Sequence, residues 1–422
     1  MTTIKTYNEH QIGGCVVSIE TDTTKIVIDF GENLPGTNSE NIQIEGLTYG
    51  KPSYDGVFFT HYHGDHIGRI VDVLPEIPLY VGKIARKVVS TIADAITNKE
   101  LLEILSDENR VHEIRANKAV VVGDIKVTPY TADHSAYEAF MFLIETPDQT
   151  ILHTGDFREH GYQGRKGLIP TIRKYITCDG KRKINSLIIE GTMMSRKNEK
   201  VYTEADMLRD ATKLFQKNKY VFLICSSTNV DSLATFYQAG KRNGMQMFCN
   251  WYVEKQLKIY KEEAGKKSSL YNFEHVHRWK PDENLTKGAW KGTQYDILLK
   301  YGFVTIIKGT AAYEKWIQEF EERSGKKATV IYSMWEGYIS SGKYQDKELA
   351  EFCKKHDAIS MHTSGHAYME TIEKVINEIN PTDAIYPIHT EYPQKFLELQ
   401  ISEEQKRKVR GMRHGVQKRN FK

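Results

Sequence analysis

The stretch Thr60-His61-Tyr62-His63-Gly64-Asp65-His66 places three imidazoles and one carboxylate within six residues, directly after a short apolar strand. In a loop that leaves a strand, side chains at alternate positions can converge on one point. We therefore expect His61 and His63 to bind one ion, and Asp65 and His66 to turn toward a second. Imidazole and carboxylate are the ligands that Zn²⁺ takes at ~2.0–2.2 Å. The stretch predicts a metal centre; the alternative is a solvated polar loop.

Two ions need more ligands than this loop provides. Three further candidates follow strands or lie in short polar turns: His134 in Ala132–Ser135, Asp156 in His153–Phe157 and His389 in Pro387–Glu391. Each of them alone is more often a turn residue or a buried polar group with a hydrogen-bond partner. Their order after the histidine-rich loop favours metal ligation.

Composition limits the class of protein. A chain of 422 residues predicts two or three domains, and 40% hydrophobic with 27% charged residues excludes wholesale disorder. No apolar run approaches the ~18–20 residues that cross a membrane, and Met1–Gln11 carries no hydrophobic signal core. Five cysteines without a CxxC pair indicate a reducing compartment, and we expect a cytoplasmic protein without a membrane partner. The net charge of +3 neither requires nor excludes a nucleic-acid partner.

The spacing of apolar residues predicts two kinds of domain. Short β-branched runs joined by turns dominate the first half and favour a mostly antiparallel sheet arrangement. After Ser195, strands and helices alternate, as in a small α/β domain with a parallel sheet. There, Thr203 and Asp206 form a capping-box pattern, and Tyr220–Cys225 has the continuous apolar character of a strand buried on both faces.

The strand-rich pattern returns after about Ser360, so we predict one domain interrupted by another. The predicted boundaries are 1–194 for the first part, 195–358 for the insertion, 359–400 for the return segment and 401–422 for a basic tail. Within that tail, Lys406–Lys422 holds eight Lys or Arg and no acidic residue. Phosphate-backbone binding and a solvated or frayed end are equally good interpretations of it.

The order His61-x-His63-x-Asp65-His66, His134, Asp156 resembles the metallo-β-lactamase superfamily. Asp29, in Ile28–Gly31, matches the aspartate that this superfamily places before the loop. The resemblance implies an α/β (α+β) fold, an αββα sandwich with a two-metal site at one edge of its sheets.

The interruption after Ser195 resembles the β-CASP nuclease branch, which carries an inserted α/β domain and three extra motifs. Glu190 matches the acidic residue that ends a strand before the insertion, His366 matches the histidine after it, and His389 matches a third. The flanking residues are most similar to ribonuclease J. A histidine at position 389 favours RNA over DNA, and the implied partner is single-stranded RNA, with a homodimer left open.

The resemblance also implies a role for each residue. One zinc would be held by His61, His63, His134 and Asp156, and the other by Asp65, His66, His389 and Asp156, with manganese as an alternative metal. A water between the ions would be the nucleophile, because coordination lowers its pKa from ~15.7 toward ~7. His366 would contact the scissile phosphate, Glu190 would orient a histidine, and Asp29 would orient the metal-binding loop.

Candidate phosphate contacts come from two segments. Ser364, Gly365 and His366 precede an expected helix, Ala367–Ile379, whose free amides and dipole favour an anion; an ordinary helix cap is the alternative. Ser227 and Asn229 lie in a stretch that resembles one used near substrate phosphates. A bound 5′-monophosphate would allow 5′→3′ exonuclease action, and endonuclease action stays equally open.

Other interpretations remain at this point. Trp335 and Tyr338 would either stack on unpaired bases or pack between the domains. The alternative functions are a DNA nuclease of the β-CASP type and a small-molecule ester or thioester hydrolase of the same superfamily. A non-enzymatic scaffold is a third alternative, but such a protein would be expected to lack some of the metal ligands.

Overall fold

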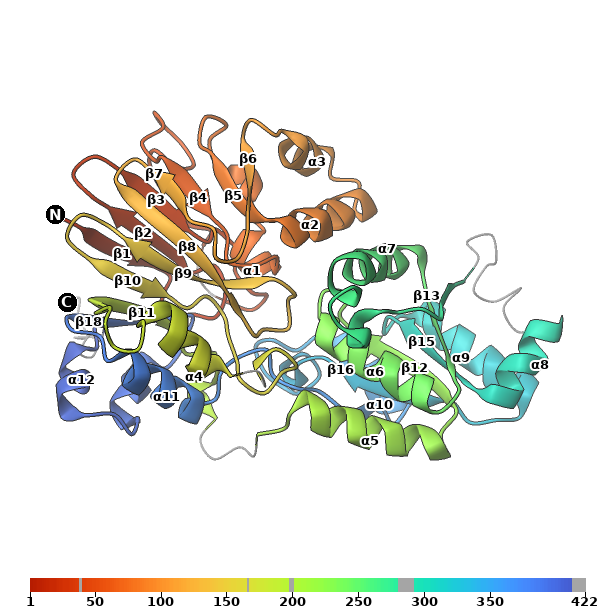
Figure 1. The fold of residues 1–422 in the computed structure, drawn as a ribbon. Coiled ribbons are helices and arrows are strands. Elements are labelled where there is room, and N and C mark those ends of the chain that lie inside the picture. The colour runs from red at the N-terminus through yellow and green to blue at the C-terminus, as the bar shows by residue number, and fades with distance from the viewer. Residues whose placement is uncertain (38–39, 165–166, 197–200, 280–291, 412–422) are drawn as a thin grey trace, which may run out of the picture.

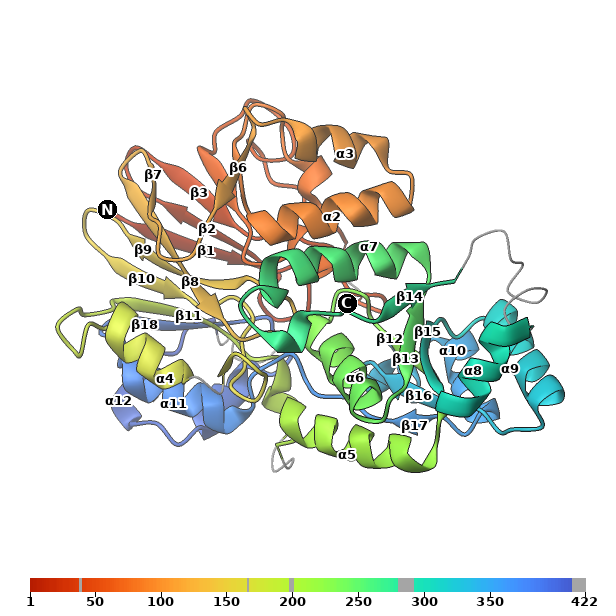
Figure 2. The ribbon, with the colours of Figure 1, turned by 45° about the vertical axis from the view of Figure 1, so that its right-hand side comes forward.

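The computed structural model describes the chain apart from residues 38–39, 165–166, 197–200, 280–291 and 412–422. Its described strands form three six-stranded sheets. The first two sheets pack face to face, and the third lies in a separate body beside them (Figures 1 and 2).

The first sheet has the order β1-β2-β3-β4-β5-β6 and the second has the order β18-β11-β10-β9-β8-β7. Their strands are β1 (Thr3–Tyr7), β2 (Val16–Glu20), β3 (Lys25–Ile28), β4 (Gly56–Phe58), β5 (Leu79–Gly82), β6 (Val111–Ile114), β7 (Val120–Val122), β8 (Ile125–Ala132), β9 (Ala139–Glu145), β10 (Thr150–His153), β11 (Ser186–Glu190) and β18 (Ala384–Ile388). Their helices are α1 (Gly64–Ile67), α2 (Lys83–Ala95), α3 (Lys99–Ser106), α4 (Leu168–Thr171), α11 (Met369–Ile379) and α12 (Glu403–Lys408).

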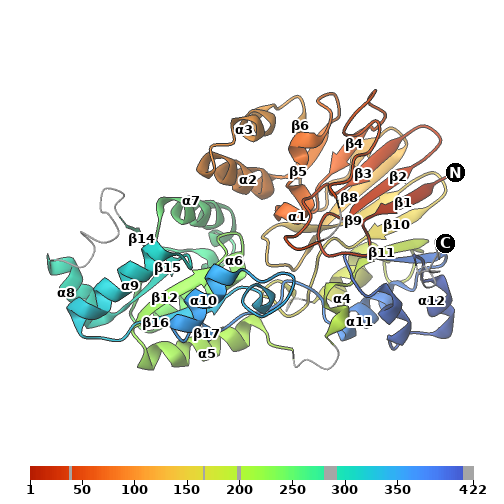
Figure 3. The same cartoon turned by 180° about the vertical axis from the view of Figure 1, so that it is seen from behind.

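Alternating side chains of β9 show how the sandwich is layered. Phe140, Phe142 and Ile144 point into the core between the two sheets, whereas Met141 and Leu143 point to the outer face of the second sheet. Helices α4 and α11 cover that outer face, and α2 and α3 cover the first sheet (Figures 1 and 3). This arrangement confirms the expected αββα sandwich.

The expected antiparallel pairing holds for β1 to β3 and for β7 to β10, but not for the other strands of the sandwich. Strands β3, β4, β5 and β6 pair in parallel, as do β10, β11 and β18. Apolar alternation identifies a strand but not its direction. Direction depends on the connections: α1 lies in the crossover from β4 to β5, and α2 and α3 lie in the crossover from β5 to β6, whereas β3 and β4 are joined by residues 29–55, in whose described part no helix occurs.

The third sheet has the order β14-β13-β15-β12-β16-β17, and all its pairs are parallel, as expected for the inserted α/β domain. Its strands are β12 (Tyr220–Cys225), β13 (Gln246–Cys249), β14 (Val276–Arg278), β15 (Phe303–Ile307), β16 (Thr329–Ser333) and β17 (Ile359–Ser360). Its helices are α5 (Glu204–Lys217), α6 (Val230–Arg242), α7 (Trp251–Tyr260), α8 (Gly292–Tyr301), α9 (Ala311–Ser324) and α10 (Lys347–Lys355). Thr203 and Asp206 form the expected capping box at the start of α5.

Strands β11 and β18 enclose the insertion in sequence yet pair directly, with Glu190 opposite Ile388. The chain therefore leaves the sandwich after one strand and returns on its neighbour. The proposed boundaries at 195 and 358 stay a prediction, although β17 (Ile359–Ser360), just after the second one, still pairs with β16 of the inserted sheet.

The first part of the proposed basic tail packs on the sandwich. Helix α12 precedes a β-bridge between Val409 and Ile385, and Lys406 and Lys408 pair with glutamates of the same helix. Residues 412–422 lie outside the described part of the chain. Among the helices that the structure describes, none is both long and apolar enough to span a membrane.

Candidate metal centre

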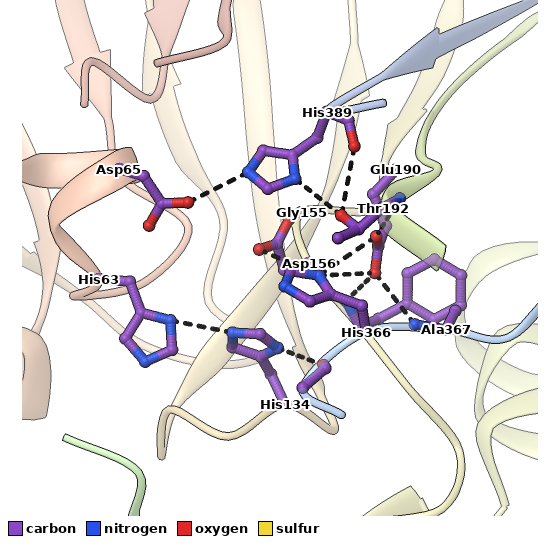
Figure 4. A network of polar contacts seen from close by, with 12 residues as sticks. His63, Asp65, His134, Gly155, Asp156, Glu190, Thr192, His366, Ala367 and His389 are labelled. Atoms are coloured by element: carbon purple, nitrogen blue, oxygen red, sulfur yellow. Dashed lines mark hydrogen bonds and ion pairs between the residues drawn. The ribbon is translucent and has the colours of Figure 1, made fainter. Parts of the chain in front are cut away.

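The expected ligands gather at one edge of the sandwich, at the carboxyl ends of strands from both sheets (Figure 4). His61 and His63 follow β4, Asp156 follows β10, Glu190 ends β11 and His389 follows β18. Because β10, β11 and β18 are parallel, their carboxyl ends meet at the same edge. The topology thus assembles the site from residues far apart in sequence.

A close backbone approach shapes the histidine loop. The Phe30 amide donates to the His66 carbonyl over 2.8 Å, so the segment after β3 lies directly against the start of α1. Gly31 is required there, because a Cβ at this position would collide with the backbone of Asp65.

His61, His63 and His134 form one group of inward-facing nitrogens, all within 4.8 Å of one another. The Nε2 atoms of His61 and His134 each lie 3.1 Å from His63 Nδ1. Burial is the main reason that the pKa of each of these imidazoles lies below its usual value, with that of His63 at about 4. They are therefore neutral at pH 7, and neutral imidazole is the form that binds a metal ion.

Hydrogen bonds to the ring nitrogens that face away from the ligand cluster orient the imidazoles of His134 and His66. His134 Nδ1 donates to the Gly365 carbonyl over 2.6 Å, which leaves the Nε2 lone pair facing the group. His66 Nδ1 lies 2.8 Å from Asp29 Oδ2, and Asp29 also accepts 2.7 Å hydrogen bonds from the Thr60 amide and hydroxyl. Asp29 thus contacts both ends of the histidine loop, the position expected for an orienting residue.

Asp65, His66 and His389 form a second group, and Asp156 lies between the two groups. His389 Nε2 is 3.2 Å from Asp65 Oδ2. Asp156 Oδ2 is 3.1 Å from His66 Nε2 and 4.0 Å from His61 Nε2, which belongs to the first group. Burial opposes ionisation of Asp65, but the neighbouring imidazoles outweigh it and keep its pKa below the usual range. Thr192 Oγ1 lies 2.8 Å from His389 Nδ1, the ring nitrogen that faces away from the ligand group.

The chemistry of this donor set fits a metal centre. Five imidazoles and two carboxylates present nitrogen and oxygen atoms to a shared space, and outer hydrogen bonds occupy the far nitrogens of four of the rings. Zn²⁺ and similar borderline ions prefer these ligands.

His366 and Glu190 meet beside Asp156, as Figure 4 shows. His366 Nδ1 lies 3.2 Å from Glu190 Oε2 and 3.5 Å from Asp156 Oδ2. Glu190 is fully buried and accepts hydrogen bonds from three backbone amides, those of residues 157, 192 and 367. Burial alone would lower the pKa of His366, but the two carboxylates outweigh it and raise this pKa to about 9.

The expected substrate contacts lie in different surroundings. Ser364, Gly365 and Asn229 line the cavity at the site, but the Asn229 side chain also caps α6, where it accepts from the Ser232 amide. Ser227 is not among the residues that line this cavity, and its hydroxyl bonds to Tyr252.

The expected helix after His366 begins at Met369 instead of Ala367. The amide of Ala367 donates to Glu190, and that of His366 donates to Ser364 Oγ. These two amides are therefore already occupied and are not free for a phosphate, and the expected phosphate contact of this segment stays a prediction.

Sequence reasoning missed Arg158, which has no exposed surface. Its guanidinium lies 2.6 Å from Asp231, 3.3 Å from Asp133 and 3.4 Å from Glu204, and it donates to the Ser364 carbonyl over 2.8 Å. It thus joins the loop of His134, the insertion and the segment before His366. The only signal in the sequence is its place two residues after Asp156, since its partners are distant along the chain.

A cavity of about 490 Å³ opens onto the metal-ligand cluster and lies between the two bodies. The sandwich contributes His63, Asp65 and Asp156 to its lining, and the insertion contributes Trp335 and Tyr338. A cavity of 300–1,000 Å³ is typical of sites for small ligands or parts of larger ones.

Two family models match the chain. Residues 24–167 match the beta-lactamase superfamily domain, which spans the histidine loop, His134 and Asp156. Residues 355–410 match the Zn-dependent metallo-hydrolase RNA specificity domain, which spans His366 and His389. The first match shows a metallo-β-lactamase superfamily domain within the chain. The second match and the relatives described next support a similarity to the ribonuclease J-like β-CASP branch.

Curated relatives match over part of the chain. Ribonuclease J of Mycoplasma pneumoniae is 27% identical over 164 residues, or 35% of this chain and 26% of that protein. Ribonuclease J of Helicobacter pylori strain 26695 is 30% identical over 155 residues, or 35% and 22% of the two chains. Ribonuclease J 1 of Streptococcus pyogenes is 30% identical over 161 residues, or 35% and 26%. The matched region thus spans about a quarter of each relative.

A crystal structure of a protein of unknown function from Enterococcus faecalis V583 has the same fold. It aligns with a TM-score of 0.67 and 20% identity, over 93% of this chain and 95% of that one. The similarity therefore extends over both the sandwich and the insertion.

Proposed function

We propose that this metallo-β-lactamase superfamily protein is a metal-dependent ribonuclease that cleaves single-stranded RNA. The observation that carries the proposal is that the two ligand groups, with His366 and Glu190 beside them, adjoin one cavity between the sandwich and the insertion. The match to an RNA specificity domain and the name of the curated relatives support RNA as the substrate.

The proposed metal ligands divide into two sets. One Zn²⁺ would be held by His61, His63 and His134, the other by Asp65, His66 and His389, and Asp156 would contribute to both. Two bound ions would supply a more acidic coordinated water and positive charge for the phosphate oxygens. Manganese is the alternative metal.

The chain's own residues would position the substrate and handle protons. Glu190 holds His366 Nδ1, so Nε2 remains available as a donor to the scissile phosphate or the departing 3′ oxygen. Donation to that oxygen leaves a 5′-phosphate on the downstream product. Asp29 and Thr192 orient their histidines by the contacts described above.

The test uses the metal-loaded protein and an RNA with a 3′ fluorophore, carrying either a 5′-monophosphate or a 5′-hydroxyl. Shortening from the 5′ end only with the monophosphate establishes a 5′→3′ exonuclease. Internal cuts with both substrates establish an endonuclease. No cleavage of either RNA by protein that holds its metal contradicts the proposal, and a DNA of the same sequence tests the alternative substrate.

Two variants separate metal binding from proton donation. Asp65→Ala removes a carboxylate ligand, so metal content and activity should fall together. His366→Ala leaves the proposed ligands in place, so metal content should persist while cleavage slows by about 10²–10⁴-fold. Full activity of His366→Ala would contradict its role. A homodimer also stays a proposal, and light scattering of the purified protein tests it.

A further inference from the structure

The metal-centre cavity extends from the ligand cluster to a group of aromatic side chains. Trp335, Tyr338 and Tyr344 line it on the side of the insertion, and Leu34 and Pro35 line it on the side of the sandwich. Trp335 directly precedes a 3₁₀ turn, Glu336–Tyr338, just beyond the carboxyl end of β16. An aromatic surface therefore lies in the same cavity as the proposed reaction centre.

The position of the Trp335 ring is defined by its surroundings. Its ring centroid lies 5.3 Å from that of Tyr338 at 80°, and 5.1 Å from that of Tyr344 at 63°. The Trp335 carbonyl accepts a 2.7 Å hydrogen bond from the Tyr332 hydroxyl. The indole lies against Gly337, where any Cβ would collide with it. Such a fixed ring loses little conformational entropy when a ligand binds.

The three aromatic residues differ in their contacts: Tyr344 is bonded to the return segment, whereas Trp335 and Tyr338 face the cavity. The Tyr344 hydroxyl donates to Glu391 over 3.1 Å, and Lys343 pairs with the same carboxylate while its Nζ lies 4.5 Å from the Tyr344 ring centroid. Tyr344 therefore joins the insertion to the return segment. Trp335 and Tyr338 are half-buried in the cavity lining and are the candidates for contact with a ligand.

An uncharged ligand suits the aromatic part of the cavity lining. The cavity is lined by the carboxylates Glu32 and Glu391 and by the cation Arg196. Lys343 pairs with Glu391, so charge does not select a phosphate at the aromatic residues. An uncharged planar base stacks on an aromatic ring with little dependence on its identity.

We propose that Trp335 and Tyr338 form a stacking subsite for an unpaired nucleobase close to the cleaved phosphate. The proposal rests on the ribonuclease activity proposed above and adds a reason for a single-stranded substrate, since a base in a duplex cannot present its face. The subsite would tolerate all four bases and would contribute to binding of one nucleotide at a fixed distance from the cut.

The experiment pairs a substrate change with a protein change. A single abasic nucleotide is moved along a single-stranded RNA, and kcat/KM is measured with wild type, Trp335→Ala and Trp335→Phe. For wild type, the abasic nucleotide should slow cleavage by about 5- to 150-fold at one position relative to the cut. Trp335→Ala should cleave intact RNA more slowly by a similar factor and should no longer respond to that abasic position. Trp335→Phe should retain most of the response.

Controls separate the possible failures. Trp251→Ala changes a half-buried tryptophan of α7 outside the cavity lining and should behave as wild type. If wild type cleaves no RNA, the proposed function itself fails. If wild type cleaves but shows no sensitive abasic position, the subsite is overturned without any variant. It is also overturned if Trp335→Ala and Tyr338→Leu, both with normal metal content, keep the full abasic effect.

Discussion

Substitution of Arg158 by methionine should strongly destabilise the protein. Methionine has a similar length but no charge, so the change leaves Asp133, Glu204 and Asp231 without their shared cation. All four side chains are buried, and the guanidinium lies 2.6–3.4 Å from the three carboxylates. Removal of one partner from a buried ion pair costs about 3–5 kcal/mol. Total stabilities are about 5–15 kcal/mol, so this loss is a large fraction.

The assay is urea unfolding of metal-loaded wild type and variant at pH 8 and 25 °C, compared through the free energy of unfolding. Arg173→Met is the matched control, because Arg173 also pairs with a glutamate, Glu378, but at the surface. Surface pairs contribute little, so this variant should stay near wild type.

A multiple variant tests the physical cause. Adding Glu204→Gln and Asp231→Asn to Arg158→Met removes two of the three unpaired charges and should recover part of the lost free energy. If Arg158→Met were as stable as Arg173→Met, the argument that a buried charge cluster joins the two domains would be wrong.

Two further predictions concern pH and metal affinity. Burial raises the pKa of Glu138 to about 7 from its ordinary 4.5, so the folded state binds the proton more tightly and stability should fall between pH 4.5 and 7. Glu138→Gln keeps an acceptor for the Ile84 amide and should gain about 1–3 kcal/mol over wild type between pH 5 and pH 8 in thermal unfolding; a pH-independent difference would refute this. Asp29→Asn disturbs the contacts to Thr60 and His66 and should weaken zinc affinity about 10–100-fold in a competition titration with a chromogenic chelator. Unchanged affinity would contradict an orienting role.

Structural features that depend only on residues close together in the chain could be predicted from the sequence. The capping box of Thr203 and Asp206 depends on residues three apart, and the parallel strand Tyr220–Cys225 is marked by its continuous apolar run. The density of imidazoles in 61–66 has few interpretations other than metal binding. The family resemblance then placed His134, Asp156 and His389 together, and the structure brings them to one edge.

Features that depend on distant partners could not be predicted. The direction of β4 to β6 follows from the crossovers and not from the strands themselves. Arg158 has no visible partner in its own segment, because two of its carboxylates come from the insertion. The Ala367 amide, just before α11, donates to Glu190, a residue far away in sequence that nothing in the local segment indicates.

The central claim is that the clustered histidines and aspartates bind the metal on which RNA cleavage depends. The most direct measurement titrates chelator-treated, metal-free protein with Zn²⁺ and follows bound metal and cleavage of a single-stranded RNA in the same samples. The account predicts no cleavage at the start, and a rate that rises with bound zinc and levels off near two ions per chain. Full cleavage by protein shown to contain no metal, or two bound ions without cleavage of any RNA, would contradict it.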